Sequence, residues 1–252
     1  IRLGIIQQGI YFNYDYGKGK NWPFQLTQNL NADMFSGYMH DGKPLNGGSH
    51  NSDYNLQDGW NSAMWGHTYS YIFPQIYQSE NATRDKHSGF FGITKILKVE
   101  VMHRVTDYYG SIVYIHFADP DAEYAPDTQE AVYKEFFCEL DTAVTVLTDY
   151  VESNPEAAEF SRFDILMDGK YTSWIKFANS LKLRLAIRIS YANKKLAQEM
   201  AESAVKHEFG VIESNEDNAK WNYFGTIPNP LYTAVRYNEE TSGGDSHVAA
   251  DI

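Results

Sequence analysis

The chain has little cysteine, few basic residues and no long apolar run. Cys138 is the one cysteine among 252 residues, so an intrachain disulfide and a zinc site built on several thiolates are both excluded. Lysine and arginine number 21 against 33 aspartates and glutamates, and the net charge of −12 repels phosphate backbones. No run approaches the ~20 apolar residues of a membrane-spanning helix. From the negative net charge we expect no nucleic-acid partner, and from the absence of a long apolar run we expect no membrane-spanning helix.

Motifs of several common enzymes are missing too. The chain contains no Gly-x-Ser-x-Gly elbow, no His-Glu-x-x-His pair and no P-loop. Cys138 lies in a helical pattern beside Phe137, where we expect a buried, unreactive thiol. We expect no catalytic residue, no metal and no cofactor. A helical glycoside hydrolase stays open as an alternative, because the distance between its two carboxylates is set by the fold and leaves no spacing signature.

Two groups of residues have the spacing of metal ligands. Glu100 and His103 form a Glu-x-x-His pair, but a di-iron site needs a second pair, and no other histidine has Glu three residues before it. Acidic residues also occupy five ligand positions of a calcium loop: Asp119, Asp121, Glu123, Asp127 and Glu130. Tyr124 stands where that loop requires glycine. We therefore expect a solvated loop, with Asp127 and Glu130 as a capping box for the next helix.

Apolar residues recur at steps of three to four over much of the chain, which predicts helices. We expect them at residues 25–39, 90–109, 128–151 and 171–191, with a last one through Leu196, Met200 and Ala204. Gly110 and Gly210 follow helices as C-terminal caps. Short loops make neighbouring helices pack as hairpins, so we predict a mostly α-helical, solenoid-like array. Residues 110–117 have the composition of one short strand.

We expect residues 1–252 to form a single domain that is truncated at both ends. Residues 1–57 are irregular, residues 58–210 carry the helical hairpins, and residues 211–252 are aromatic and loop-rich. The chain begins at Ile1 without a signal-like stretch and ends after a Gly-Gly turn. We therefore expect an internal fragment of a longer protein.

Aromatic residues are frequent and many lie among small polar residues. They make up 15% of the chain, including 19 tyrosines and 5 tryptophans, and such a mixture suits recognition of polar small molecules. In Asp58–Tyr77, helical periodicity predicts a core face made of Trp65, Tyr69, Ile72, Phe73 and Ile76. Trp60, Met64 and Tyr71 lie roughly opposite, either buried against a second neighbour or exposed. Pro74 should bend this helix.

Four segments resemble, in order, those of the SusD/RagB family of nutrient-binding outer-membrane lipoproteins of Bacteroidetes. They are WPFQLTQNLNADMFSGYM at 22–39, HRVTDYYGSIVY at 103–114, VYKEFFCELDTAVTVLTDYV at 132–151 and SWIKFANSLKLRLAIRISY at 173–191. The family's hallmark Arg-x-Thr-Asp-x-Tyr-Gly is matched by Arg104, Thr106, Asp107, Tyr109 and Gly110. Val113 stands where the family often has proline.

This resemblance implies a SusD-like fold of tetratricopeptide-like helix pairs that support a variable ligand-binding face. It also implies a protein that is not an enzyme. Family members sit on the cell surface, at the outer membrane, through a lipidated N-terminal cysteine that is absent from this chain. There they act as a lid on a SusC-like TonB-dependent transporter and capture mostly glycans, or peptides in some members.

A glycan ligand agrees with the segment 38–65. Pyranose rings stack their C–H faces on Trp or Tyr, while their hydroxyls need polar partners. The candidate glycan-binding residues are Tyr38, Tyr54, Asp58, Trp60, Asn61 and Trp65. Trp60 is the strongest candidate, because it lies in the first helical turn after a polar loop, and Trp65 is the weakest. A tetratricopeptide-like scaffold that binds protein, and a peptide-binding member of the family, are the alternatives.

Overall fold

The computed structural model describes residues 2–10, 22–40, 45–122, 125–221, 229–232 and 247–248. These residues are mostly helical, as predicted, and the strands among them are β1 (Met39–His40) and β2 (His247–Val248), which pair antiparallel. The chain divides into two compact units, which we call unit 1 (residues 1–7 and 75–222) and unit 2 (residues 8–74 and 223–252). The expected single domain with divisions near residues 57 and 210 stays a prediction.

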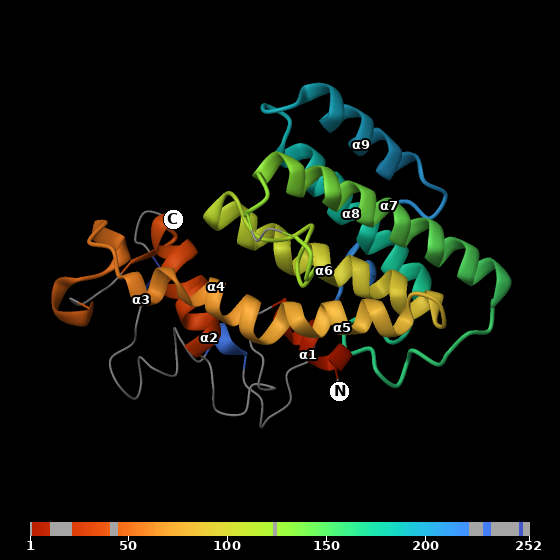
Figure 1. Cartoon of the computed structure of the whole chain (residues 1–252), viewed down its shortest axis with the longest axis horizontal. Coiled ribbons are helices and arrows are strands. Elements are labelled where there is room, and N and C mark those ends of the chain that lie inside the picture. The colour runs from red at the N-terminus through yellow and green to blue at the C-terminus, as the bar shows by residue number, and fades with distance from the viewer. Residues whose placement is uncertain are drawn as a thin grey trace. The chain divides into compact units, whose positions relative to one another are not determined.

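Unit 1 contains the long helices. They are α6 (Ser88–Tyr109), α7 (Gln129–Ser153), α8 (Tyr171–Arg188) and α9 (Lys194–Lys206), together with most of α5 (Phe73–Thr83), the start of α1 (Arg2–Gly9) and the short η5 (Asn215–Asp217). In Figure 1, α6, α7, α8 and α9 lie side by side in sequence order, and each packs on the next. The predicted array of helical hairpins is therefore confirmed. No helix in the described ranges combines the length and apolarity needed to cross a membrane.

The ends predicted for α6, α7 and α8 agree with the structure to within three residues, but one predicted cap is wrong. Asp127 does not cap α7; the Thr128 hydroxyl does, by accepting the backbone N–H of Ala131 at 3.3 Å. The Asp127 carboxylate instead accepts the backbone N–H groups of Tyr114 and Ile115, at 2.9 and 2.8 Å. This carboxylate therefore folds the preceding loop onto the start of α7.

The expected strand at 110–117 is reduced to a single bridge between Ile112 and Asp127. The Asp127 side chain occupies the next N–H groups along the loop, so no second rung of strand pairing forms. Gly110, which ends α6, has a φ of 76° and donates its N–H to the Thr106 carbonyl at 2.8 Å. This is the capping role expected of that glycine.

Helix α6 is the centre of unit 1, with most of its surface buried. Its apolar side chains Ile93, Ile96, Leu97 and Val101 are fully buried. Burial of one such side chain stabilises the fold by about 1.5–3 kcal/mol. A helix buried almost all round has no solvated face, so its charged residues must find partners inside the protein.

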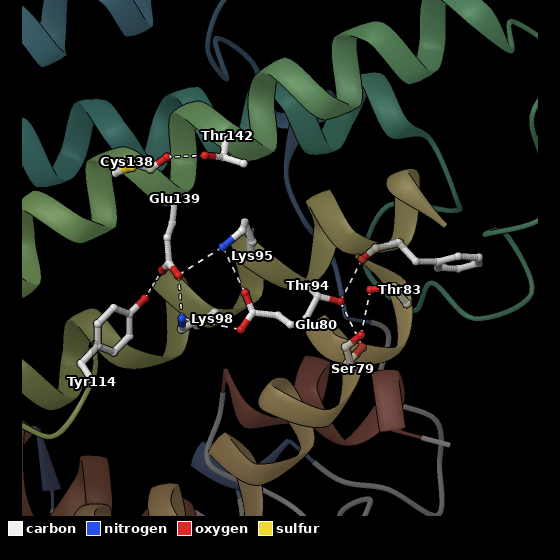
Figure 2. A network of polar contacts seen from close by, with 11 residues as sticks. Ser79, Glu80, Thr83, Thr94, Lys95, Lys98, Tyr114, Cys138, Glu139 and Thr142 are labelled. Atoms are coloured by element: carbon white, nitrogen blue, oxygen red, sulfur yellow. Dashed lines mark hydrogen bonds and ion pairs between the residues drawn. The ribbon is translucent and has the colours of Figure 1, made fainter. Parts of the chain in front are cut away.

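A buried ionic network meets this requirement for Lys95 and Lys98 of α6 (Figure 2). Glu139 of α7 lies 3.3 Å from the Lys95 amine and 2.6 Å from that of Lys98, and it also accepts a short hydrogen bond from the Tyr114 hydroxyl. Glu80 of α5 lies 3.1 Å from Lys95 and 3.6 Å from Lys98. Burial favours a lower pKa for Lys95, but the charges of Glu139 and Glu80 outweigh it and raise that pKa. The four charges balance.

Cys138 is exposed, so the prediction of a buried thiol is wrong. The buried stripe of α7 runs through Val132, Phe136, Leu140 and Leu147, as its periodicity predicts. Cys138 follows Phe136 by two residues and is therefore turned away from that stripe by about 200°. An apolar neighbour in the sequence does not indicate burial when the two residues lie on different faces of a helix.

Unit 2 is built from short and irregular helices. They are α2 (Trp22–Phe24), η1 (Gln25–Asp33), η2 (Leu45–Gly48), η3 (Asn51–Asp53), α3 (Asp58–Asn61), α4 (Ala63–His67), η4 (Thr68–Ile72) and α10 (Pro230–Tyr232). Both η1 and η4 are π-helices. The predicted helix at 25–39 begins earlier and ends near residue 35, and Gly37 adopts a φ of 77° in the turn that follows.

The two faces predicted for residues 58–77 are only partly correct. Ile72, Phe73 and Ile76 are buried as expected, and Tyr71 is exposed. Met64 is buried, which is one of the two alternatives left open for its face, whereas Trp65, expected in the core, is only half-buried. The prediction included a bend at Pro74 but none before it, whereas the chain breaks at Ser62 and adopts a π-helix just before the α5 turn that contains Pro74. Both features change the angle between successive side chains.

We predict that Glu139→Gln lowers the free energy of unfolding by about 3–5 kcal/mol, because Lys95 and Lys98 would then be buried with one carboxylate between them. Urea denaturation followed by circular dichroism measures the change. Glu130→Gln is the matched control on the same helix. Glu130 pairs with Lys134 at the surface, so its loss should leave the unfolding midpoint unchanged. Equal midpoints for both variants would show that the network does not stabilise the fold.

Candidate functional site

Two buried asparagines of unit 2 attach the polar loop 51–61 to η1. The Asn51 amide donates to the Leu30 carbonyl at 2.8 Å and to the Asn61 side-chain oxygen at 2.9 Å. Its own oxygen accepts the backbone N–H of Gln57 at 3.3 Å. Asn31 donates to the Trp60 carbonyl at 3.2 Å. These bonds hold the backbone of η3, α3 and the residues between them in place.

Large apolar side chains project into solvent from this fixed loop and from the turn that follows η1. Tyr38, Tyr54 and Leu56 are 63%, 72% and 54% exposed. Tyr54 has a φ of 56°, in the left-handed region, which costs a non-glycine residue about 1–2 kcal/mol. Its ring lies 5.8 Å from that of Phe35. An exposed ring on a strained backbone makes Tyr54 a candidate for ligand contact.

The six sequence-predicted residues all lie in unit 2, but they differ in what they offer to a ligand. Tyr38, Tyr54 and Asp58 are exposed, and Trp60, Asn61 and Trp65 are half-buried. Asn61 bonds to Asn51 and so positions the loop. Trp65 packs on Tyr69 with ring centroids 4.5 Å apart. In the described part of the chain, no ring contact joins Tyr38, Tyr54 and Trp60, so each presents its ring separately.

Sequence reasoning missed two residues of this surface, Phe35 and Leu56. Phe35 supports the Tyr54 ring, and Leu56 is an exposed aliphatic side chain in the same loop. The signal for Leu56 was available, because it is the one aliphatic residue in the polar run Asn51–Asp58. Phe35 gave no such signal, since an aromatic residue within a helix is normally read as core.

The residues Arg104–Gly110 connect three helices. The Thr106 hydroxyl donates to the Gly110 carbonyl at 2.6 Å and closes the end of α6. Asp107 accepts the Tyr133 hydroxyl of α7 at 2.6 Å and the Arg188 guanidinium of α8 at 3.2 Å. Burial, together with the hydrogen bond to Asp107, raises the pKa of Tyr133 above its usual range. This segment therefore has an architectural role.

Glu100 and His103 lie one turn earlier on α6 and are both buried. Burial raises the pKa of Glu100 to about 7, although the charges of Arg184 and Arg104 act in the opposite direction. Burial, followed by the charge of Arg184, lowers the pKa of His103 to about 4. The nearest carboxylate oxygen of Glu100 is 4.0 Å from His103 Nδ1. The described residues contain no group of three or more side chains that could hold a metal ion.

Several carboxylates of the acidic loop are occupied by contacts within the protein. Asp119 accepts the backbone N–H of Asp121 at 3.0 Å, and Glu130 pairs with Lys134 at 2.6 Å. Asp127 closes the loop as described above. Glu123 and Tyr124 lie outside the described residues. The absence of bound calcium stays a prediction.

Comparison with protein-family models shows to which family this chain belongs. A SusD-like family model, described as Susd and RagB outer membrane lipoprotein, matches residues 2–252. The chain belongs to the SusD-like family. The resemblance seen in the sequence motifs is thereby confirmed. Among curated proteins, none matches the chain.

Solved SusD homologues share the fold of this SusD-like chain. One from Bacteroides vulgatus is 41% identical with a TM-score of 0.88, and the match covers 99% of this chain and 49% of that one. A chitin-binding homologue from Flavobacterium johnsoniae is 39% identical with a TM-score of 0.86, covering 98% and 50%. A third, from Bacteroides uniformis, is 40% identical with a TM-score of 0.85, covering 99% and 51%. The chain spans about half the length of these relatives.

We predict that Asn51→Ala lowers the free energy of unfolding by about 1–3 kcal/mol, because it removes several hydrogen bonds inside the protein. It should also increase hydrogen exchange at residues 57–61, measured by mass spectrometry. Asn55→Ala is the control, since the exposed Asn55 bonds at the surface to Gly48 and Ser49 and to no other described residue. If exchange at residues 57–61 is equal in the two variants, Asn51 does not hold the loop.

We also predict that Glu100→Gln stabilises the protein above neutral pH. A folded-state pKa raised to about 7 means that the folded state favours the protonated carboxyl of Glu100. The free energy of unfolding is therefore highest, as far as this group is concerned, below pH 4.5, and it falls as the pH rises through 7. The wild type should lose about 3 kcal/mol over this interval relative to the variant. Urea denaturation at pH 4.5 and pH 8 measures the difference. An equal change in both proteins would contradict the prediction.

Proposed function

We propose that this SusD-like chain belongs to a non-catalytic cell-surface protein that binds glycans. It would capture an oligosaccharide or polysaccharide and deliver it to a partner SusC-like TonB-dependent transporter. The observation that carries the proposal is the exposed ring of Tyr54 on a loop that buried asparagines fix, with the exposed ring of Tyr38 in the same unit. Rings that are already in place lose little conformational freedom when a sugar stacks on them.

The chemistry of this surface suits a neutral or weakly charged sugar. Tyr38, Tyr54 and Trp60 offer aromatic faces to pyranose C–H groups, and Asp58 offers an exposed carboxylate to the hydroxyls. Asn61 positions this loop, and Trp65 would contribute through packing. A homologue that is 39% identical is described as chitin-binding, which supports a glycan over a peptide.

The family description supports the location. SusD-like proteins are described as outer membrane lipoproteins, and we propose that the whole protein is anchored there by lipid and faces the outside. A net charge of −12 makes nucleic acid an unsuitable partner.

We predict that Tyr54→Ala and Trp60→Ala each weaken glycan binding about tenfold, which corresponds to the loss of about 1.4 kcal/mol of stacking energy. Calorimetry with chitooligosaccharides and a panel of other oligosaccharides measures affinity, and chromatography of the incubated sugars detects cleavage. Tyr191→Ala is the control, because Tyr191 is fully exposed in unit 1.

Each outcome of this experiment separates the candidate functions. Unchanged affinity in both variants would show that the site assignment is wrong, even where the protein binds glycans. Released products would favour a helical glycoside hydrolase. Binding of peptides without glycans would favour a peptide-binding member of the family.

A tetratricopeptide-like scaffold that binds protein is the second candidate, and one observation favours it. A groove of about 630 Å³ between α7 and α9 is lined by Phe137, Leu196 and Met200 together with the exposed Cys138. Apolar grooves between helices accept partner helices or peptides. In the same experiment, a protein partner that protects Cys138 from a thiol reagent, without any glycan binding, would favour the scaffold.

A further inference from the structure

A second groove, in unit 1, presents aromatic rings next to polar groups. It has a volume of about 640 Å³ and lies among α1, α5, α6 and the segment before α8. Phe90 and Phe163 form its aromatic wall, with ring centroids 6.3 Å apart and planes 69° apart. Phe163 is 48% exposed, so its ring is available to a ligand.

The hydroxyl groups on one side of this groove can act only as acceptors. Thr94 donates its hydroxyl proton to the Phe90 carbonyl at 2.8 Å, so the Ser79 hydroxyl must be the donor in their mutual 3.1 Å bond. Thr83 donates to the Ser79 carbonyl at 2.8 Å. Figure 2 shows the three hydroxyl side chains together. The oxygens of Ser79 and Thr83 keep unused lone pairs, which suit a ligand that brings O–H donors.

The groove also contains a cation without a counter-ion. Neither the Arg2 guanidinium nor the Gln75 amide has a hydrogen-bond or ion-pair partner among the described residues. Arg2 is the one charged side chain among the described residues that line the groove. The Arg162 guanidinium adds a second positive charge nearby, 6.0 Å from the Phe163 ring centroid. In a chain of net charge −12, this groove favours an anion.

We propose that this groove binds an acidic sugar unit, a pyranose that carries a carboxylate. The C–H face of the sugar stacks on Phe163, its hydroxyls donate to Ser79 and Thr83, and its carboxylate pairs with Arg2. The proposal rests on the proposed function in that the protein binds saccharides, and it adds a second site with its own ligand class. A peptide fits less well, because most of its carbonyls would be left without donors.

Titration of the full chain with acidic oligosaccharides tests this site. The panel consists of trigalacturonate, glucuronate-containing disaccharides and sialyllactose, and the methyl ester of trigalacturonate serves as the uncharged control. We expect binding of at least one acidic sugar, and about tenfold weaker binding to Phe163→Ala. Arg2→Gln should remove the preference for the acid over its ester. Raising the salt concentration should weaken binding to the wild type more than to Arg2→Gln.

Two further variants distinguish acidic-sugar binding in the unit 1 groove from glycan binding at the unit 2 surface. Tyr54→Ala should leave acidic-sugar binding unchanged, and Tyr191→Ala is the control for a general surface effect. The proposal is overturned if no acidic sugar binds, if peptides bind instead, or if Tyr54→Ala rather than Phe163→Ala removes binding. The last result would leave a single saccharide site in unit 2 and the proposed function intact. Acidic-sugar binding that depends on Phe163 would stand even where the unit 2 site fails.

Discussion

Burial of α6 is the constraint on which the rest of unit 1 depends. A helix with apolar contacts on nearly all sides gains much of the free energy that holds the unit together, but its buried length leaves few solvated positions for charged residues. Lys95 and Lys98 therefore bind carboxylates from α5 and α7. Asp107, near the end of the helix, binds α7 and α8. The polar contacts of α6 thus set how its neighbours are placed along it.

The same constraint explains what the Arg104–Gly110 motif does in the structure. Thr106, Asp107 and Gly110 close α6 and join it to the next two helices. These geometric demands are satisfied by few residue types, since Gly110 has a positive φ and Asp107 must accept from both Tyr133 and Arg188.

Unit 2 uses a different physical principle for its candidate surface. Short helices, two of them π-helical, provide little regular packing, and buried amides replace it by bonding to backbone carbonyls across the unit. A buried amide that satisfies specific carbonyls fixes one backbone path, because any other leaves those groups unpaired. The exposed ring of Tyr54 is therefore carried on a defined loop.

The sequence by itself determined the helices of unit 1, their hairpin order and the family, because apolar spacing and a local motif are properties of neighbouring residues. It also placed Tyr38, Tyr54 and Trp60 in one aromatic, polar segment. Only the tertiary structure decided which side chains are exposed. Met64 is buried and Cys138 is not, and the Asp127 carboxylate bonds to a loop rather than capping α7. The exposure of a side chain and its hydrogen bonds depend on contacts with residues distant in the sequence. A periodic pattern along one helix carries no information about those contacts.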